Sequence, residues 1–198
     1  MMKFYRKFPS RLTTLALILT LFAVSFAKGH DGSFPDIKIK NFGQMDERFY
    51  RGAQPKEEDY KDLAALGVKT VIDLREDPKA YEKSSVEALG MRYVNIPMSD
   101  KKYPNLDQVN QFLKLVDDPI TGKFFVHCAG GRHRTGVMGA AYRFNHNHWN
   151  FDQVYAEMKG YDFYTRFGHG KMKDFVQDYW QHLQPKQTIA TVPATVTR

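Results

Sequence analysis

Strand-like apolar runs alternate with helical stretches through the middle of the chain, and this alternation restricts the possible folds most. Val68 to Leu74 (VKTVIDL) is a β-branched run that predicts a buried strand. Further strands are predicted at Arg48 to Arg51, Met91 to Ile96 and Lys123 to His127. Because helical stretches separate these runs, the chain is predicted to fold as an α/β domain, with a mostly parallel central sheet flanked by helices.

The helical stretches are recognised by their apolar spacing and by the residues that end them. In Leu106 to Val116, for example, Val109 and Phe112 fall on the same face as the two end residues. The predicted helices are residues 55–67, 81–89, 106–116, 135–145, 151–159 and 170–183. In parallel sheets, ligands bind beyond the carboxyl ends of the strands, so functional residues are expected in the loops that follow strands.

Residues 1–27 have the pattern of a secretory signal peptide. Met1 to Arg11 contains four basic residues and no acid, and Leu12 to Phe26 is apolar apart from threonine and serine. The run ends at Ser25-Phe26-Ala27, a small-x-small cleavage site. It is short for a membrane span, which needs about 20 residues. We expect cleavage and a periplasmic or secreted protein; a chain anchored in the membrane by an uncleaved signal is the alternative.

The remaining chain has room for one domain of ordinary size, predicted at residues 28–184. Lys28 to Met45 is polar and is expected to pack across this domain as a leader. Residues 185–198 are rich in threonine, alanine and valine without a clear period, and are predicted to be a disordered tail.

Charge and cysteine content exclude several classes of protein. Signal cleavage lowers the formal net charge from +7 to +3, too little for a nucleic-acid-binding protein. The single cysteine, Cys128, excludes an intrachain disulfide and a four-thiolate zinc site. We expect a monomer with no cofactor, no metal and, after cleavage, no stable membrane span.

Cys128 begins a glycine-rich loop between a predicted strand and a predicted helix, in the segment HCAGGRHRTG. Two adjacent glycines allow a tight loop whose amides point inward, and the following helix adds the positive end of its dipole. This arrangement suits a tetrahedral oxyanion and lowers the pKa of a cysteine thiol. Arg134, six positions later, can bring its planar guanidinium over the anion. The sulfur can then attack phosphorus and form a covalent intermediate.

The segment HCAGGRHRTG resembles the His-Cys-x5-Arg-Thr/Ser signature of cysteine-dependent protein tyrosine and dual-specificity phosphatases. Upstream, YRGAQPKEEDYKDLAALGVKTVIDLRED looks like the start of the compact bacterial, plant and fungal members of that family. The resemblance covers roughly residues 48–163. It implies a phosphatase fold and hydrolysis of phosphate monoesters through a phosphocysteine.

The resemblance also implies roles for the loop residues. Cys128 would be the nucleophile, and Arg134 would bind the phosphoryl group and stabilise the transition state. Thr135 would donate its hydroxyl to the sulfur, and His127 would position the cysteine through hydrogen bonds. The loop amides would cradle the phosphate; they belong to Ala129, Gly130, Gly131, Arg132, His133 and Arg134.

The family uses an aspartate on a loop after an upstream strand as general acid, and Asp100 is our choice for it. Asp100 follows the predicted strand Met91 to Ile96. Asp107 is the second candidate, although acids are common at helix starts for structural reasons. Another acid, or none, is the remaining alternative.

Several other polar or aromatic groups have both structural and functional interpretations. Asp73, Arg75 and Glu76 are expected to form a structural ion-pair network rather than catalytic groups. His146 and His148 are expected to be a polar cluster at a helix end rather than a metal site. The aromatic residues Tyr161, Phe163, Tyr164 and Phe167 are expected to pack in the core, with a pocket wall as the alternative. The charged residues Lys101, Lys102, Arg132 and His133 are either solvated or add positive charge for a polyanionic substrate.

The predicted substrates are phosphotyrosine or phosphoserine/threonine proteins, or small anionic phosphoesters such as inositol phosphates. A catalytically silent phosphate-binding module is the first alternative. A rhodanese-like sulfurtransferase is the second, although there the loop is usually shorter and the His-Cys and Arg-Thr flanks are not expected.

Overall fold

A computed structural model describes residues 34–184 as a five-stranded sheet with helices on both faces. The strands are β1 (Gly43–Gln44), β2 (Phe49–Ala53), β3 (Val68–Arg75), β4 (Arg92–Met98) and β5 (Lys123–Cys128). The α-helices are α1 (Tyr60–Ala65), α2 (Glu82–Ala88), α3 (Leu106–Asp117), α4 (His133–Tyr142), α5 (Phe151–Gly160) and α6 (Gly170–Leu183).

The strand order is β1-β2-β5-β3-β4, and every pair except β1-β2 is parallel. The predicted α/β fold with a mostly parallel sheet is therefore confirmed. β5 lies in the middle, between β2 and β3, so the loop after it opens at the centre of the carboxyl edge of the sheet.

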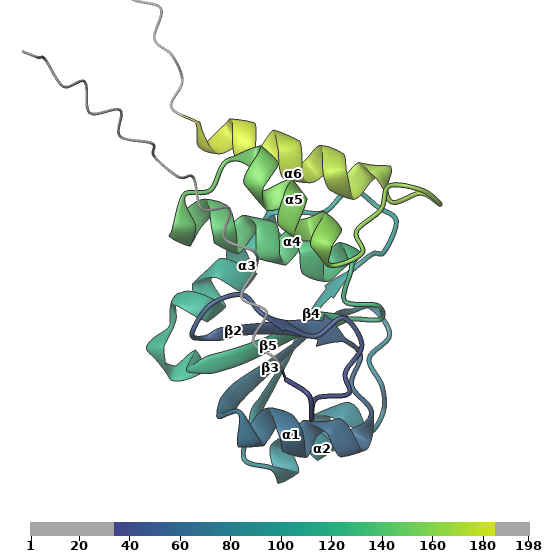
Figure 1. The fold of residues 1–198 in the computed structure, drawn as a ribbon, viewed down its shortest axis with the longest axis vertical. Coiled ribbons are helices and arrows are strands. Elements are labelled where there is room, and N and C mark those ends of the chain that lie inside the picture. Colours follow the sequence, from purple (N-terminus) through teal and green to yellow (C-terminus); the bar gives the residue numbers. More distant parts are fainter. Residues whose placement is uncertain (1–33, 185–198) are drawn as a thin grey trace, which may run out of the picture.

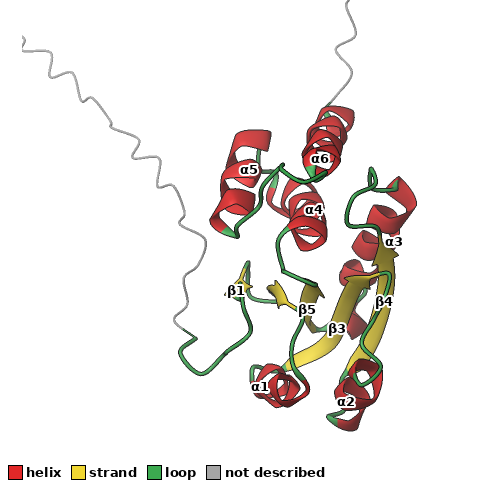
Figure 2. Cartoon of the chain, turned by 90° about the vertical axis from the view of Figure 1, so that its right-hand side faces the viewer, coloured by secondary structure: helices red, strands yellow, loops and turns green. Residues whose placement is uncertain are grey.

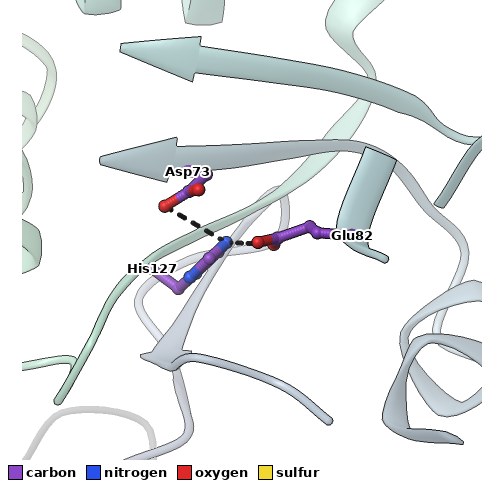
Figure 3. Close-up of side chains that lie close together, drawn as sticks. All are labelled: Asp73, Glu82 and His127. Carbon is purple, nitrogen blue, oxygen red and sulfur yellow. Dashed lines mark ion pairs between the residues drawn. The ribbon is translucent and has the colours of Figure 1, made fainter. Parts of the chain in front are cut away.

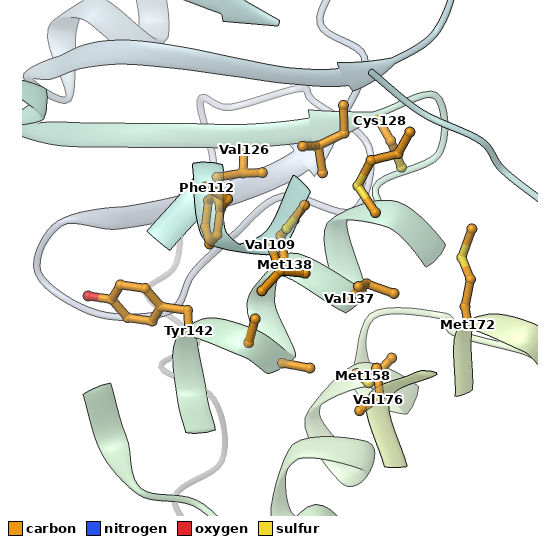
Figure 4. Packing of buried hydrophobic residues seen from close by; sticks show 14 of the residues in the cluster. Val109, Phe112, Val126, Cys128, Val137, Met138, Tyr142, Met158, Met172 and Val176 are labelled. Atoms are coloured by element: carbon orange, nitrogen blue, oxygen red, sulfur yellow. The ribbon is translucent and has the colours of Figure 1, made fainter. Parts of the chain in front are cut away.

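The helices form two layers, one on each face of the sheet. Figures 1 and 2 show α1 and α2 on one face and α4, α5 and α6 on the other, with α3 on the same side as α4. Each layer has its own hydrophobic core, because side chains along a strand point alternately to opposite faces. In β5, Phe124 and Val126 belong to the core under α3–α6, whereas Phe125 belongs to the core under α1 and α2. Figure 4 shows part of the first core, which also contains Cys128.

The segment before β2 packs across the domain, as predicted for the described part of the leader. Phe34, Ile37, Ile39 and Phe42 contact the core under α1 and α2, and Met45 is buried in the other core. The predicted signal peptide and the predicted disordered tail lie outside the described residues. Within residues 34–184, no helix has the length and apolarity that crossing a bilayer requires.

Several element ends differ from the predictions for local reasons. The helix predicted from Pro55 begins at Tyr60, because Glu57–Asp59 form a 3-10 turn in which the Asp59 carboxylate accepts a 2.8 Å hydrogen bond from the Lys56 amide. α4 begins at His133, two residues before the predicted start, and a π-helical turn (Arg143–Asn147) follows it. β1 was not predicted, because two residues are too few to show the alternation of apolar and polar residues that indicates a strand.

Candidate active site

Cys128 is the last residue of β5, and the loop that follows it leads directly into α4. Strand alternation turns its side chain toward α4, on the same face as Val126, and only 3% of the residue is exposed (Figure 4). The sulfur therefore lies at the start of a helix, at the carboxyl edge of the sheet, where the sequence predicted it.

Gly131 allows the loop to turn as tightly as it does. Its φ of +66° lies in the left-handed region, and a Cβ added there would lie 2.5 Å from the carbonyl carbon of Gly52 and 2.6 Å from the amide nitrogen of Ala53. Both the backbone conformation and the contact with β2 require glycine at this position.

Carbonyl groups of the loop are turned outward and are hydrogen-bonded by the surrounding protein. The Gly131 carbonyl accepts 2.7 Å and 3.1 Å bonds from Arg51 Nη2 and Asn41 Nδ2. The Ala129 carbonyl accepts a 3.4 Å bond from the Gln54 amide. With these carbonyls held from outside, the loop amides are left to face an anion.

Arg51 and Asn41 were not predicted as functional residues. Arg51 is 1% exposed, and its guanidinium lies 3.9 Å from the centroid of the Tyr161 ring. An arginine at the end of a predicted short strand was the only sequence signal that could have singled it out. Asn41 carries no such signal, because its role depends on a residue 90 positions away.

The pKa of the Cys128 thiol is lowered, although burial by itself raises it. The positive charge of Arg134, the Thr135 hydroxyl, and the amides of Thr135 and Gly130 together outweigh the effect of burial. These groups favour the thiolate, which is the nucleophilic form of cysteine.

The Arg134 side chain is 7% exposed and is held by one bond, from Nη1 to the Met98 carbonyl at 3.2 Å. Within residues 34–184 it forms no ion pair with a carboxylate. Its charge is therefore available both to the sulfur and to a bound anion. The Thr135 hydroxyl is fully buried and, among the described residues, has no hydrogen-bond partner of good geometry, although it contributes to the lowered pKa of the Cys128 thiol.

His127 differs from the prediction that it positions the cysteine through hydrogen bonds. Strand alternation turns its side chain to the opposite face, where it stacks on Phe125 with the ring centroids 5.6 Å apart. Its Nε2 atom lies 2.7 Å from Glu82 Oε1 of α2 and 3.9 Å from Asp73 Oδ1 of β3, and Figure 3 shows the two carboxylates on either side of it. Within the described part of the chain, neither ring nitrogen has a hydrogen bond of good geometry, although Nε2 lies close to the Glu82 carboxylate.

Asp73 and Glu82 complete a fully buried polar cluster with His127. Burial raises the pKa of Glu82, but the hydrogen bonding and charge of His127 outweigh it, and the net pKa is lowered. Burial raises the pKa of Asp73, and the charge of His127 only partly opposes this. The Tyr60 hydroxyl donates a hydrogen bond to Glu82 Oε1 at 2.8 Å, and the Tyr93 hydroxyl donates one to Asp73 Oδ2 at 3.0 Å.

The same cluster is the one group within residues 34–184 whose ligand atoms are close enough to hold a metal ion, all within 4.8 Å of one another. Tyrosine and glutamine donors already occupy carboxylate oxygens there, which suits a structural network. Of the three residues predicted to form an ion-pair network, Asp73 lies in this cluster and Arg75 pairs with Asp77 at 2.9 Å. Glu76 lies outside the network and is exposed.

Asp100 lies in the exposed loop after β4, at the same edge of the sheet as the Cys128 loop. Its backbone carbonyl accepts a 2.8 Å hydrogen bond from Nδ1 of His169. Asp107 lies instead in the first turn of α3, where the Asn105 side chain accepts from its amide at 2.9 Å. Of the two candidate acids, Asp100 is the one that lies in the loop after β4, whereas Asp107 belongs to a helix.

The loop after β4 also borders a pocket of about 180 Å³. Met98, whose carbonyl holds Arg134, is one of its walls. Lys102 and Tyr103 are two more. The side chains of Lys101 and Lys102 are exposed and form no ion pair within residues 34–184.

The remaining candidates separate into buried and exposed groups. His133 is 8% exposed, and Arg132 pairs with Asp162 at 3.6 Å. His146 contacts Asp117 at 2.7 Å, which supports the predicted polar cluster at a helix end. Of the aromatic residues, Phe163 is in the core as predicted, whereas Phe167 is 78% exposed.

The family model described as "DSP-PTPase phosphatase fused to NAD+ Kinase" matches residues 26–177. The chain belongs to this phosphatase family. A rice protein named as a probable chloroplastic NAD kinase 2 is 30% identical over 128 residues, which are 62% of this chain and 12% of that protein.

Other relatives of this phosphatase are named as phosphatases, with no kinase in the name. A Mycosarcoma maydis protein named as a tyrosine-protein phosphatase, OCA1, is 28% identical over 75% of this chain and 93% of that protein. The inositol diphosphatase SIW14 of Saccharomyces cerevisiae is 25% identical over 72% of this chain and 50% of that protein. The crystal structure of TpbA from Pseudomonas aeruginosa superposes with a TM-score of 0.61 at 23% identity, covering 73% of this chain and 86% of that one, and confirms the fold.

Membership of the phosphatase family agrees with the sequence resemblance and makes the chain a cysteine-type phosphatase. The loop geometry fits that assignment without a metal, because amides, Arg134 and the start of α4 supply the positive field. The residues that hold the loop in shape come from β2, the leader and the segment before α6, far from the signature in sequence.

Proposed function

We propose that this phosphatase hydrolyses phosphate monoesters through a phosphocysteine at Cys128. The observation that supports this most is the lowered pKa of a buried thiol beside an arginine without a carboxylate partner. The Cys128 thiolate attacks phosphorus, the bond from phosphorus to the ester oxygen breaks, and Asp100 gives its proton to that oxygen. Arg134 and the loop amides stabilise the charge on the transferring oxygens.

In the second step, a water molecule attacks phosphorus while Asp100 takes one of its protons. The bond between sulfur and phosphorus breaks, inorganic phosphate leaves, and the thiolate is restored. The Thr135 hydroxyl, buried beside the sulfur, stabilises the departing thiolate by a hydrogen bond.

The test is hydrolysis of p-nitrophenyl phosphate. Replacing the nucleophile, Cys128→Ser, is expected to lower kcat by at least about a thousandfold, because the weaker hydroxyl nucleophile replaces a thiolate. Vanadate, which mimics the five-coordinate transition state, is expected to inhibit the wild type. Asp107→Asn serves as the control and should keep the wild-type rate. Equal measurable rates for the wild type and Cys128→Ser would contradict a phosphocysteine at Cys128, and no hydrolysis by the wild type would favour a silent phosphate-binding module.

We propose phosphoesters with further negative charge as substrates, such as phosphoproteins or inositol phosphates. Lys101 and Lys102 support this, because they are exposed and unpaired with carboxylates in the described part of the chain, and Lys102 lines the pocket beside Met98. The names of OCA1 and SIW14 fit the two substrate classes. A panel with a phosphotyrosine peptide, a phosphoserine peptide and an inositol polyphosphate would separate them.

We also propose that residues 1–27 direct the chain out of the cytoplasm. The basic start, the apolar run and the small residues before Lys28 support this. Mass spectrometry of the protein recovered from the periplasm or medium should find a chain that begins at Lys28. A full-length chain in the membrane fraction would indicate an uncleaved anchor instead.

A further inference from the structure

Two buried histidines stack on each other between the phosphate-binding loop and the loop that carries Asp100. His133 is the residue before Arg134 and the first residue of α4, and His169 precedes α6. Their ring centroids are 3.6 Å apart, the ring planes differ by 7°, and each residue is 8% exposed. Such close, parallel packing fixes each ring relative to the other.

Each ring also makes one hydrogen bond to a backbone carbonyl. His133 Nε2 donates to the Tyr164 carbonyl at 3.0 Å, and His169 Nδ1 donates to the Asp100 carbonyl at 2.8 Å. Because a carbonyl oxygen only accepts, the hydrogen must lie on Nε2 of His133 and on Nδ1 of His169. The tautomers of both rings are therefore set by the backbone.

The Asp100 loop has few other ties to the rest of the protein. The amides of Lys101 and Lys102 donate only to the Ser99 hydroxyl, at 3.4 Å and 3.3 Å. Among the described residues, the bond from His169 is the one hydrogen bond between the backbone of residues 99–102 and another segment. His169 is thus well placed to fix where the Asp100 backbone lies.

We propose that His169 is a positioning residue for the general acid, and that its stack on His133 ties the Asp100 backbone to the phosphate-binding loop. The inference rests on the proposed function, since it gives Asp100 the role of proton donor. The groups around the two histidines keep His133 neutral, which is compatible with its stacking on His169. Burial, the charge of His169, and the charges of Arg132 and Arg134 lower the pKa of His133 to about 4, although the bond to Tyr164 opposes this. His133 therefore stays neutral near neutral pH.

The test compares two substrates that differ in how much they need a proton donor. Phenyl phosphate has a poor leaving group and depends on the acid, whereas p-nitrophenyl phosphate has a good one and depends on it less. His169→Phe keeps a ring for the stack but loses the donor. It is expected to lower kcat/KM for phenyl phosphate by about tenfold or more, and for p-nitrophenyl phosphate by less than about threefold.

A second variant separates the hydrogen bond from the stack. His169→Asn places an amide N–H near the position of Nδ1 and removes the ring, so it is expected to keep the ratio of the two rates within about threefold of the wild type. Equal loss in the Asn and Phe variants would overturn the assignment to the hydrogen bond. Should His169→Phe fail to fold, His169→Leu removes the donor without adding volume and takes its place.

His146→Phe is the matched control. His146 also stacks on an aromatic ring, Tyr142, at 4.2 Å, and also contacts a polar group, Asp117 at 2.7 Å, but it lies outside the site. It should leave both rates unchanged. A loss of the same kind in His146→Phe would show a general effect on the fold, and would overturn the proposal.

Asp100→Asn distinguishes a failure of this inference from a failure of the proposed function. It should show the same dependence on leaving group as His169→Phe, and the double variant should lose no more than Asp100→Asn alone. If Asp100→Asn shows the dependence and His169→Phe keeps the wild-type ratio, the positioning role alone is wrong. If Cys128→Ser stays active, or Asp100→Asn loses no rate on phenyl phosphate, the proposed function itself is wrong.

Discussion

Neighbouring residues of one strand serve opposite faces of the sheet in this phosphatase. Cys128 faces α4 and the phosphate-binding loop, while His127 faces α2 and meets Glu82. The His-Cys pair was visible in the sequence, but the resemblance implied that His127 positions the cysteine through hydrogen bonds. Because side chains alternate along a strand, the two side chains lie on opposite faces of the sheet, and His127 contacts Glu82 of α2.

At this scale, the charge of Arg134 should determine the pH at which the Cys128 thiol becomes reactive. Burial raises the pKa of Cys128, and Arg134 is the strongest of the groups that lower it. Arg134→Met is therefore expected to move the pKa upward and to slow alkylation by iodoacetamide about tenfold or more near pH 6. Rates of alkylation measured against pH test this.

Arg132→Met is the control for that measurement, because Arg132 pairs with Asp162 and is not among the groups that set the pKa of Cys128. Its alkylation profile should follow the wild type. An unchanged profile in Arg134→Met would mean that the loop amides alone stabilise the thiolate.

Single elements could be predicted where the signal is local. The strand from Val68, the helix from Leu106 and the glycine-rich loop all follow from spacing or residue type within about a dozen positions. The contacts that shape the site could not be predicted, because they join distant elements. Asn41 reaches Gly131, and Glu82 of α2 reaches His127. Neither residue has a local pattern that sets it apart from an ordinary polar side chain.

The helix α2 should stabilise the fold chiefly through Glu82. Removing one partner of a buried pair typically costs about 3–5 kcal/mol, and Glu82→Gln is expected near the lower end because the amide keeps some hydrogen bonds. The pKa of Glu82 is lowered in the folded state, so its contribution is present above the usual pKa of glutamate and is lost as the pH falls through the folded pKa. Urea unfolding at neutral and acidic pH measures both effects.

Glu87→Gln is the matched control on the same helix. Glu87 pairs with Lys83 in an exposed i,i+4 arrangement, and such pairs contribute less than about 0.5 kcal/mol. If the two variants unfolded alike at neutral pH, the buried contact with His127 would contribute little. A difference between them that grew toward acidic pH would contradict the direction of the pKa change.

At the scale of the whole molecule, the leader before β2 belongs to the folded domain. Ile39 and Phe42 pack under the sheet, and Asn41 holds the carbonyl groups of Gly130 and Gly131. The leader is thus part of both the core and the site; its packing across the domain was predicted, whereas its contact with the Cys128 loop was not.

A protein of residues 34–184 is therefore expected to fold and to hydrolyse p-nitrophenyl phosphate at close to the full-length rate. A shorter protein that starts at Asp46 should lose at least about tenfold in kcat/KM, since it lacks Asn41 and part of a core. Thermal unfolding and steady-state rates compare the two. Equal activity would mean that Arg51 holds the loop without help from the leader.

The single thiol of the chain has a consequence for its chemical survival. A stabilised thiolate is also the form that hydrogen peroxide oxidises to sulfenic acid. Where a second cysteine lies nearby, a disulfide captures the sulfenic acid and allows rescue, but this chain has no second cysteine to form one. Recovery then depends on a small external thiol or on capture by a backbone nitrogen, and further oxidation is irreversible. The environment that activates the sulfur thus also makes oxidants its most direct inhibitors.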